Sequence, residues 1–255
     1  MTTGVFVGLW VALAVGLALA GCRGKAQDRD FGRAFFSNGS DGATHGHAQC
    51  AKEASVGHQW SHARLAASLE RARAERLVLH TYAHAPFLNL TEYVAELDWA
   101  RAHGVAMVTY RELAAGYRGA GWAFTIDDDE VDTWYAWRDV MRAHHAKVTF
   151  FVTRYDRFTA RQKQELRELV ADGHDVEAHG TNHENAVDYV AAHGLERYLR
   201  DEVRPNRDAL AADGFAPVAF AYPYGAHTAE IDRAVAGEVA LLRTVGGAWC
   251  LKAAP

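Results

Sequence analysis

Residues 147–178 read KVTFFVTRYDRFTARQKQELRELVADGHDVEA, and this stretch decides the fold class. It begins with an apolar, β-branched run at Lys147–Thr153 and ends with a second short run at Asp175–Ala178. Between them, Thr159 stands three residues before a glutamine, as in a helix capping box, and Gly173 is a good helix terminator. A strand, a helix and a second strand at this spacing predict a parallel βαβ unit.

The same alternation continues on both sides of this stretch. Segments with helical periodicity separate further short apolar runs, and Asn89, three residues before Glu92, suggests another capping box. We therefore predict an α/β fold with a largely parallel sheet, either open or closed into a barrel, with its active site at the carboxyl ends of the strands. The other predicted strands are Leu77–Tyr82, Val105–Tyr110, Trp122–Ile126, Val218–Tyr222 and Leu241–Val245.

The composition is that of a globular protein. The chain has 255 residues, of which 49% are hydrophobic and 23% charged, and this excludes a disordered chain. Its 27 basic and 32 acidic side chains give a net charge of −5, which argues against nucleic acid as a partner. The 14 histidines are a first indication of metal or acid–base chemistry.

The N-terminus has the features of an export signal. Val5–Ala20 is an uncharged apolar run, too short for a comfortable membrane span, and it leads into Leu-Ala-Gly before Cys22. This arrangement resembles a bacterial lipoprotein signal, which implies a signal peptide over residues 1–21 and a lipid anchor on Cys22. Arg23 then favours the outer membrane, facing the periplasm, if the host is Gram-negative. No Lys or Arg precedes the run, so an uncleaved N-terminal anchor helix is the alternative.

Residues 22–60 contain many Gly, Ser, Asp and His residues and show no periodicity. We predict that they form a flexible tether, followed by a domain over residues 61–255. Export makes a disulfide between Cys50 and Cys250 feasible, although two free thiols are equally compatible with the sequence.

Acidic residues crowd the end of one predicted strand. Five carboxylates lie between Asp127 and Asp132, directly after Trp122–Ile126. Clustered carboxylates raise one another's pKa, and a fold keeps them together chiefly when a cation or a proton relieves the repulsion. The alternative is a solvated acidic turn.

Two histidines follow another strand end. His179 and His183 are four residues apart, which places two imidazoles on one face of a helical turn, as a metal requires. The spacing alone is weak evidence, because the pairs 58/62 and 80/84 share it. The position of His179 directly after the predicted strand at 175–178 distinguishes this pair.

A third strand ends in Tyr222-Pro223-Tyr224-Gly225. The proline fixes the turn and has no N–H of its own, so the backbone N–H of Tyr224 is free to point into a site. The alternative is an ordinary strand-to-loop turn.

Taken together, these segments resemble the NodB-type polysaccharide deacetylases, a carbohydrate esterase family with a distorted barrel of strands and helices. Thr125–Asp128 is similar to the family's T-F-D-D motif, and Lys147–Val152 to the strand that follows it. Gly173–His183 is similar to its G-H-E-I-x-x-H-[ST]-x-x-H segment, and Tyr222–Gly225 to its third motif. The resemblance covers roughly residues 77–247 and implies a distorted or incomplete (β/α) barrel.

The resemblance also implies residue roles. Asp127 corresponds to the general base, while Asp128, His179 and His183 correspond to the ligands of a divalent metal, which we expect to be Zn²⁺. Three nitrogen and oxygen ligands leave a coordination position open, as catalytic zinc sites do. The backbone N–H of Tyr224 corresponds to a donor for the oxyanion.

The sequence departs from the family pattern at three places. Asp129 replaces a glycine that often follows the paired aspartates. Ala221 stands where many members carry an arginine that orients the base, so the partner of Asp127 is open. The C-terminal L-x-H segment that supplies the family's general acid is absent from the sequence.

A replacement for this acid is expected near the first strand. Leu77-Val78-Leu79-His80 resembles the N-terminal strand–histidine element of permuted members that act on poly-N-acetylglucosamine. We predict His80 as the general acid and His84 as the second candidate. The alternative is that His80 is a packed strand residue.

The resulting hypothesis is a metal-dependent hydrolase that removes N-acetyl groups from an amino-sugar polysaccharide of the cell envelope. Its substrate would be poly-N-acetylglucosamine, peptidoglycan or a chitin-like polymer. The alternatives are an O-acetyl esterase that acts on envelope glycans, and a catalytically silent carbohydrate-binding lipoprotein. No feature of the sequence indicates an oligomeric state.

Overall fold

The computed structural model describes residues 36–37, 46–50 and 62–245. The predicted signal peptide over residues 1–21, the predicted lipid-bearing Cys22 and Cys250 lie outside this range. None of the helices in the described ranges is long and apolar enough to cross a membrane. The strands are β1 (Phe36–Ser37), β2 (Gly46–Cys50), β3 (Val78–His84), β4 (Ala106–Met107), β5 (Gly121–Asp128), β6 (Thr149–Val152), β7 (Asp175–Ala178), β8 (Ala219–Ala221) and β9 (Leu241–Val245).

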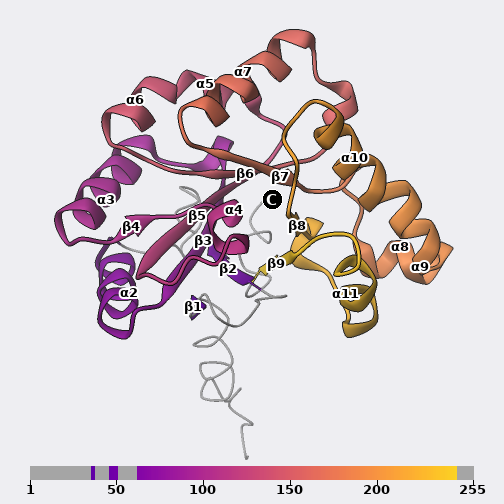
Figure 1. The fold of residues 1–255 in the computed structure, drawn as a ribbon, viewed down its shortest axis with the longest axis horizontal. Coiled ribbons are helices and arrows are strands. Elements are labelled where there is room, and N and C mark those ends of the chain that lie inside the picture. The colour runs from indigo at the N-terminus through magenta and orange to yellow at the C-terminus, as the bar shows by residue number, and fades with distance from the viewer. Residues whose placement is uncertain (1–35, 38–45, 51–61, 246–255) are drawn as a thin grey trace, which may run out of the picture.

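Helices surround these strands, so that the strands form the centre and the helices the outer layer (Figure 1). The α-helices are α2 (His62–Glu75), α3 (Leu90–Ala102), α4 (Tyr110–Ala114), α5 (Val131–Ala136), α6 (Arg138–Ala143), α7 (Ala160–Ala171), α8 (Ala186–His193), α9 (Leu195–Tyr198), α10 (Arg204–Ala212) and α11 (Ala229–Val235). The short 3₁₀ and π segments are η1 (Ala85–Phe87), η2 (Tyr155–Arg157), the π-helical η3 (Leu199–Val203) and η4 (Pro223–Gly225).

The sheet is a distorted barrel. Parallel pairings connect β3 to β5, β5 to β6, β6 to β7, β7 to β8 and β8 to β9. The short strand β2 pairs in parallel with both β9 and β3, so these strands form a ring. β1 pairs antiparallel with β3, and β4 pairs with the start of β5. The predicted fold class, a distorted or incomplete (β/α) barrel, is confirmed.

The predicted strands are all present, and several have shifted ends. The first one extends to His84 rather than Tyr82, and the run at 105–110 forms a two-residue strand followed by helix α4. β1 and β2 lie inside the segment 22–60 that its composition predicts to be a tether, so the sheet takes two short strands from it. Pairing uses main-chain hydrogen bonds, which a polar composition does not reveal.

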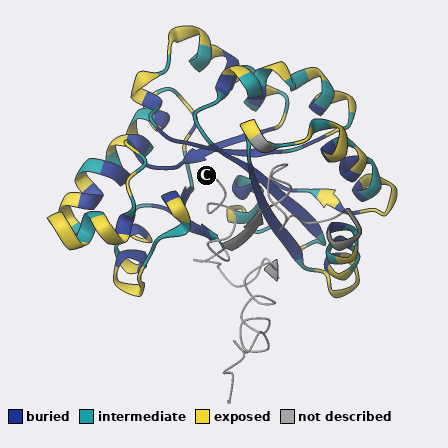
Figure 2. Cartoon of the chain, turned by 180° about the vertical axis from the view of Figure 1, so that it is seen from behind, coloured by how far each residue is buried: buried dark blue, intermediate teal, exposed yellow. Residues whose placement is uncertain are grey.

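Buried side chains form two layers. The strands are mostly buried and the helices partly exposed (Figure 2). The larger layer lies between strands and helices and includes Phe124 and Phe150 of the strands and Leu166 of α7. The smaller layer lies inside the ring, where Val78, Phe151 and neighbouring strand residues pack against the aromatic ring of Tyr110. Residues of the two layers therefore alternate along β3, β5, β6, β8 and β9, as a barrel requires.

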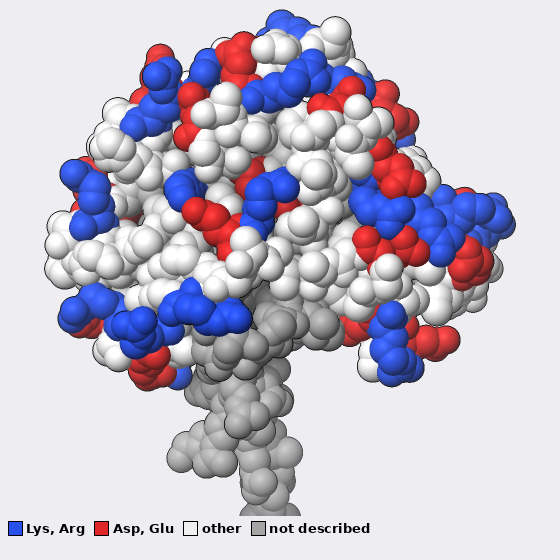
Figure 3. All heavy atoms as spheres, viewed as in Figure 1, with Lys and Arg blue, Asp and Glu red and all other residues white. Residues whose placement is uncertain are grey.

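Helix α4 covers the amino ends of the strands. The Tyr110 N–H donates to Thr149 Oγ1 at the start of β6, and the Arg111 N–H and guanidinium donate to the carboxylate of Asp175 at the start of β7. Charged side chains of both signs gather on this face over α4 (Figure 3). Because one mouth of the barrel is occupied in this way, the opposite mouth, at the carboxyl ends, is the place for a pocket.

Candidate active site

A pocket lies at the carboxyl ends of the strands, where the sequence predicts it. The chain segments that meet there come from β3, β5, β7, the turn after β8, and β9. The pocket is lined by Tyr82, His84, Asp127, His179, His183, Tyr222, Tyr224, Gly225, Arg243 and Val245.

Two consecutive aspartates end β5. Asp127 is buried and faces the pocket, and in a regular strand the next side chain would point to the opposite face. Asp128, however, has a φ of 89°, a conformation that non-glycine residues rarely adopt. The carboxylate of Asp128 thereby reaches the same histidines that line the pocket, and such strain at a strand end is typical of functional sites.

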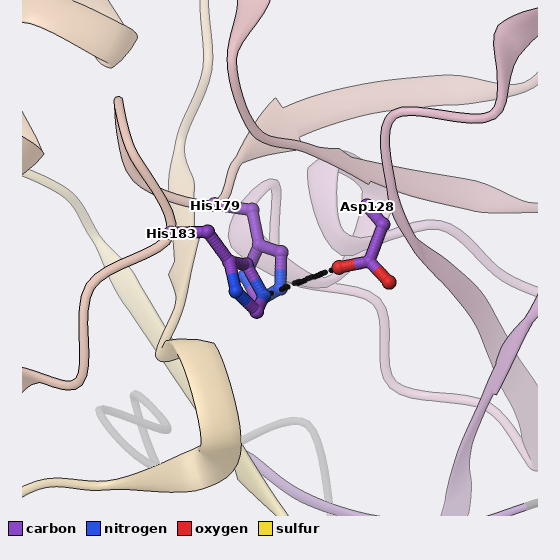
Figure 4. A group of neighbouring side chains, drawn as sticks. All are labelled: Asp128, His179 and His183. Atoms are coloured by element: carbon purple, nitrogen blue, oxygen red, sulfur yellow. Dashed lines mark ion pairs between the residues drawn. The ribbon is translucent and has the colours of Figure 1, made fainter.

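The structure brings Asp128, His179 and His183 together (Figure 4). Asp128 Oδ1 lies 3.1 Å from His183 Nε2 and 3.7 Å from His179 Nε2. One ligand atom from each of the three residues lies within 4.8 Å of the others. Ligands of a tetrahedral zinc ion, with bonds of about 2.1 Å, are about 3.4 Å apart, so this donor set fits a divalent metal.

The hydrogen bonds and charges of these three residues also favour metal binding. His179 Nδ1 donates to the Ala221 carbonyl at 2.9 Å, which leaves Nε2 as the free lone pair, as in metal-bound histidines. Burial holds the pKa of His179 well below its ordinary value, so the ring is neutral. Burial alone would raise the pKa of Asp128, but the imidazoles of His183 and His179 hold it below its ordinary value. A carboxylate and two neutral imidazoles are the protonation states that a metal binds.

Asp127 has a cationic partner that the motifs do not show. Arg243 Nη2 lies 2.5 Å from Asp127 Oδ2, and both side chains are almost completely buried. The guanidinium lies over the rings of Tyr82 and Phe151, at 5.3 and 4.9 Å from their centroids. Burial raises the pKa of Asp127 above its ordinary value, and the charge of Arg243 opposes that rise.

Arg243 therefore supplies the partner of Asp127 that the sequence left open, next to Ala221. The two residues are paired neighbours, because Ala221 of β8 lies opposite Arg243 of β9 in the sheet register. A signal was present in the sequence, since an arginine inside the apolar strand Leu241–Val245 needs a buried carboxylate as its partner.

The two candidate acids of β3 lie at different depths. His84 pairs in register with Asp127, lines the pocket and places Nε2 3.7 Å from Asp128 Oδ2. His80 pairs with Ala123, four residues and therefore about 13 Å further toward the amino end of the strand.

His80, which the sequence predicts as the general acid, is not among the residues that line the pocket. Its Nδ1 lies 3.0 Å from the Tyr110 hydroxyl, in the buried layer inside the ring. The alternative, a packed strand histidine, describes its place. The strand predicted from the sequence ends at Tyr82, whereas β3 ends at His84. The prediction therefore favours His80 over the histidine that lies at the end of the strand.

Tyr224 lies at the mouth of the pocket. The turn η4 has hydrogen bonds from the Gly225 N–H to the Tyr222 carbonyl and from the Ala226 N–H to the Pro223 carbonyl, and the Tyr224 N–H is not one of these donors. Tyr224 has a φ of 60°, and its ring, half exposed, meets the edge of His183 at 4.8 Å between centroids. This placement is compatible with a backbone donor beside the histidines.

Comparison with known families agrees with this site. The family model for polysaccharide deacetylase matches residues 116–240, a range that contains the acidic strand end, both histidines and the Tyr224 turn. Residues 116–240 belong to the polysaccharide deacetylase family. Arg243 and His84 of this deacetylase-family domain lie outside the matched range, on the two flanking strands.

Solved structures with similar folds include IcaB from Ammonifex degensii, with 18% identity and a TM-score of 0.47 over 76% of this chain and 80% of that one. The BpsB deacetylase domain from Bordetella bronchiseptica shows 16% identity and a TM-score of 0.45 over 58% and 81%. The chitin deacetylase from Colletotrichum lindemuthianum shows 21% identity and a TM-score of 0.39 over 47% and 53%. No protein with a curated description matches the deacetylase-family chain.

Proposed function

We propose that the protein is a metal-dependent hydrolase that removes N-acetyl groups from an amino-sugar polysaccharide. The observation that carries this proposal is one pocket in which an Asp-His-His ligand set lies beside a buried aspartate with its own cationic partner. Asp128, His179 and His183 would hold the metal, which we propose to be Zn²⁺. When bound, such an ion polarises the substrate carbonyl and lowers the pKa of a water molecule.

The chain's own residues supply the proton transfers. Asp127 Oδ2 is occupied by Arg243, while Oδ1 has no hydrogen-bond partner among the described residues and is the oxygen available to take the proton of the attacking water. As the water oxygen adds to the acetyl carbon, negative charge develops on the carbonyl oxygen. The backbone N–H of Tyr224, a residue that lines the pocket, is the donor that we propose for this charge. The bond between carbon and nitrogen then breaks, acetate leaves, and the amine takes a proton.

We assign that last proton to His84 in place of His80. His84 lines the pocket next to Asp127, whereas His80 is packed against Tyr110. A general acid matters most when the leaving group is a poor one, as an amine is, and contributes about 10²- to 10⁴-fold.

The test compares two substrates. The His84→Ala variant should lose about 10²- to 10⁴-fold in acetate release from N-acetylglucosamine oligomers. The same variant should retain most activity on an activated aryl acetate, whose leaving group departs without a proton. Asp127→Asn should lose activity on both substrates, and His80→Gln serves as the matched control on the same strand.

Equal losses of His84→Ala on both substrates would remove His84 as the acid. A wild-type protein that binds zinc but releases no acetate from any acetylated glycan would support the carbohydrate-binding alternative instead. Release of acetate from O-acetylated glycans alone would identify the esterase.

We also propose that the protein acts in the cell envelope, held to a membrane by lipid on Cys22. The apolar run Val5–Ala20 before Cys22 supports this proposal. Metabolic labelling with a fatty acid tests it: the wild-type protein should incorporate label and Cys22→Ala should not. Labelling that survives this substitution, or no labelling of the wild type, would contradict the lipid anchor.

A further inference from the structure

The loop between the two metal-binding histidines is held by a carboxylate from outside the site. Glu202, in the π-helical segment η3, is completely buried. Its Oε1 and Oε2 each lie 3.1 Å from the backbone nitrogen of Asn182, Oε1 accepts from Asn182 Nδ2 at 2.7 Å, and Oε2 accepts from the Glu184 N–H at 3.3 Å. The backbone carbonyl of Glu202 accepts from the N–H and the hydroxyl of Thr181. A buried carboxylate is costly unless such donors surround it, and here the donors come from a single loop.

That loop needs support, because its backbone is strained. His183 has a φ of 67°, which costs a non-glycine residue roughly 1–3 kcal/mol. Gly180 has a φ of 85°, and a Cβ at this position would lie 3.0 Å from Glu202 Oε2. The positive φ and this tight contact together favour glycine at position 180, and the contacts with Glu202 stabilise the conformation that turns His183 toward His179.

The sequence explains why Glu202 is in this place. Helix α10 begins at Arg204, and Pro205 follows inside a continuous helical run from α9. A proline has no N–H for the carbonyl four residues earlier, so the helix widens there. The Arg204 N–H instead donates to the Leu199 carbonyl, five residues back, which is the π-helical pattern often found near functional sites.

The same helical run also holds the other histidine. Asn206, four residues after Glu202 and buried, accepts from the His179 N–H through Oδ1 at 3.0 Å. Thr153 of β6 donates to the Gly180 carbonyl at 2.8 Å. The backbone from His179 to Glu184 is thus fixed at successive points, with Glu202 providing most of them.

We infer that Glu202 is a positioning residue that fixes His183 relative to Asp128 and His179 and thereby sets the metal affinity of the site. The inference rests on the proposed metal site. Partners that orient metal ligands typically change affinity by about 10- to 100-fold when they are removed. Glu202→Gln keeps the shape of the side chain but replaces one accepting oxygen with a donor.

Glu177→Gln is the matched control. Glu177 is equally buried, and its Oε2 accepts from the backbone N–H groups of Val218 and Ala219, at and just before the start of β8, rather than from the backbone of residues 181–184. Both substitutions should lower the midpoint of thermal unfolding. Only Glu202→Gln should also weaken zinc binding, by roughly 10- to 100-fold in a chelator competition assay.

A second readout does not need the metal. In the metal-free protein, Glu202→Gln should speed hydrogen exchange at the amides of Asn182 and Glu184 beyond any global change, and Glu177→Gln should not. A folded Glu202→Gln protein with wild-type zinc affinity and unchanged exchange overturns the inference. If Glu202→Gln does not fold, Asn182→Ala removes one exposed donor to the same carboxylate, and unchanged zinc affinity of that variant overturns it equally.

These results separate the two proposals. A wild-type protein that binds no zinc refutes the proposed function and the role of Glu202 in metal affinity, while the exchange data still report whether Glu202 orders the loop. If the wild-type protein binds zinc and releases acetate, and Glu202→Gln has wild-type zinc affinity and hydrogen exchange, only the positioning role is refuted.

Discussion

Replacing Arg243 with methionine tests the ion pair that holds Asp127. Methionine fills much of the same space between Tyr82 and Phe151 but removes the charge. Asp127 Oδ2 then loses its partner at 2.5 Å in an environment where both side chains are almost inaccessible to water. The folded protein must either keep a buried, unpaired carboxylate or protonate it.

The expected magnitude follows from the burial of the pair. Breaking a buried ion pair by removing one partner costs about 3–5 kcal/mol in free energy of unfolding. In electrostatic terms, unit charges about 4 Å apart at an effective dielectric constant of about 20 interact by about 4 kcal/mol. Losing this interaction raises the pKa of Asp127 still further above its ordinary value, because burial then acts without the opposing charge of Arg243.

The sign of the pH dependence is fixed by this rise. A carboxyl group whose pKa is higher in the folded state binds more protons there than in the unfolded chain, so stability falls as pH rises through that interval. Arg243→Met should therefore be closer to the wild type at pH 5 than at pH 8. If Asp127 is the base, the acidic limb of kcat/KM should also move to higher pH.

A double-mutant cycle measures the pair directly. Urea unfolding of the wild type, Arg243→Met, Asp127→Asn and the double variant, at pH 8 with chelator, gives the coupling energy between the two residues. We expect the double variant to recover most of the stability lost by Arg243→Met. A coupling energy below about 1 kcal/mol, in the range of exposed pairs, would refute the reasoning.

Three further predictions concern single histidines and one turn. Burial lowers the pKa of His174 to about 4 from 6.5, so the native state loses up to about 3 kcal/mol of stability as pH falls from 6.5 toward 4. In urea unfolding at a series of pH values, the unfolding free energy of His174→Asn should decline less steeply over this range than that of the wild type, and an equally steep decline contradicts this. His80→Gln should cost about 1–3 kcal/mol in unfolding free energy because it disturbs the contact with Tyr110, yet leave kcat for acetate release unchanged; a large fall in kcat would return His80 to the mechanism. Tyr224→Gly should raise the unfolding midpoint by relieving the positive φ, a gain of about 1 kcal/mol, and a lower midpoint would show that the ring contact with His183 outweighs the strain.

Most of the fold was predictable because its signals are local. The strand at Asp175–Ala178 and the capping box that begins α7 at Thr159 agree with the sequence prediction, and Gly173 has the expected positive φ of 100°. The strands β1 and β2 were missed because a polar segment can pair through its main chain without an apolar pattern.

The site was predictable only where motifs follow strand ends. Asp127, Asp128 and the two histidines could be placed at one edge of the sheet from the parallel topology alone. Arg243 could not, because its contact with Asp127 crosses the interior of the ring between strands that are not neighbours. The positive φ of Asp128 likewise follows from tertiary packing rather than from local sequence.

Glu202 illustrates the same limit. Nothing in a five-residue segment between two helices marks it as a support for a loop 20 residues earlier. The contact exists because Pro205 alters the helix and because Gly180 leaves room for the carboxylate. Neither the proline nor the glycine, considered alone in the sequence, indicates this contact.

The position of Arg243 on β9 has a consequence for synthesis. Most of the described domain lies between His84 and Arg243 along the sequence, so β3 and β9 emerge from the ribosome far apart in time. The nascent chain presents both histidines and both aspartates well before the guanidinium of Arg243 exists. Contacts of such high sequence separation also form late in folding, since their loop-closure entropy must be overcome first. The ion pair that completes the pocket is therefore expected to be among the last contacts made by the growing polypeptide.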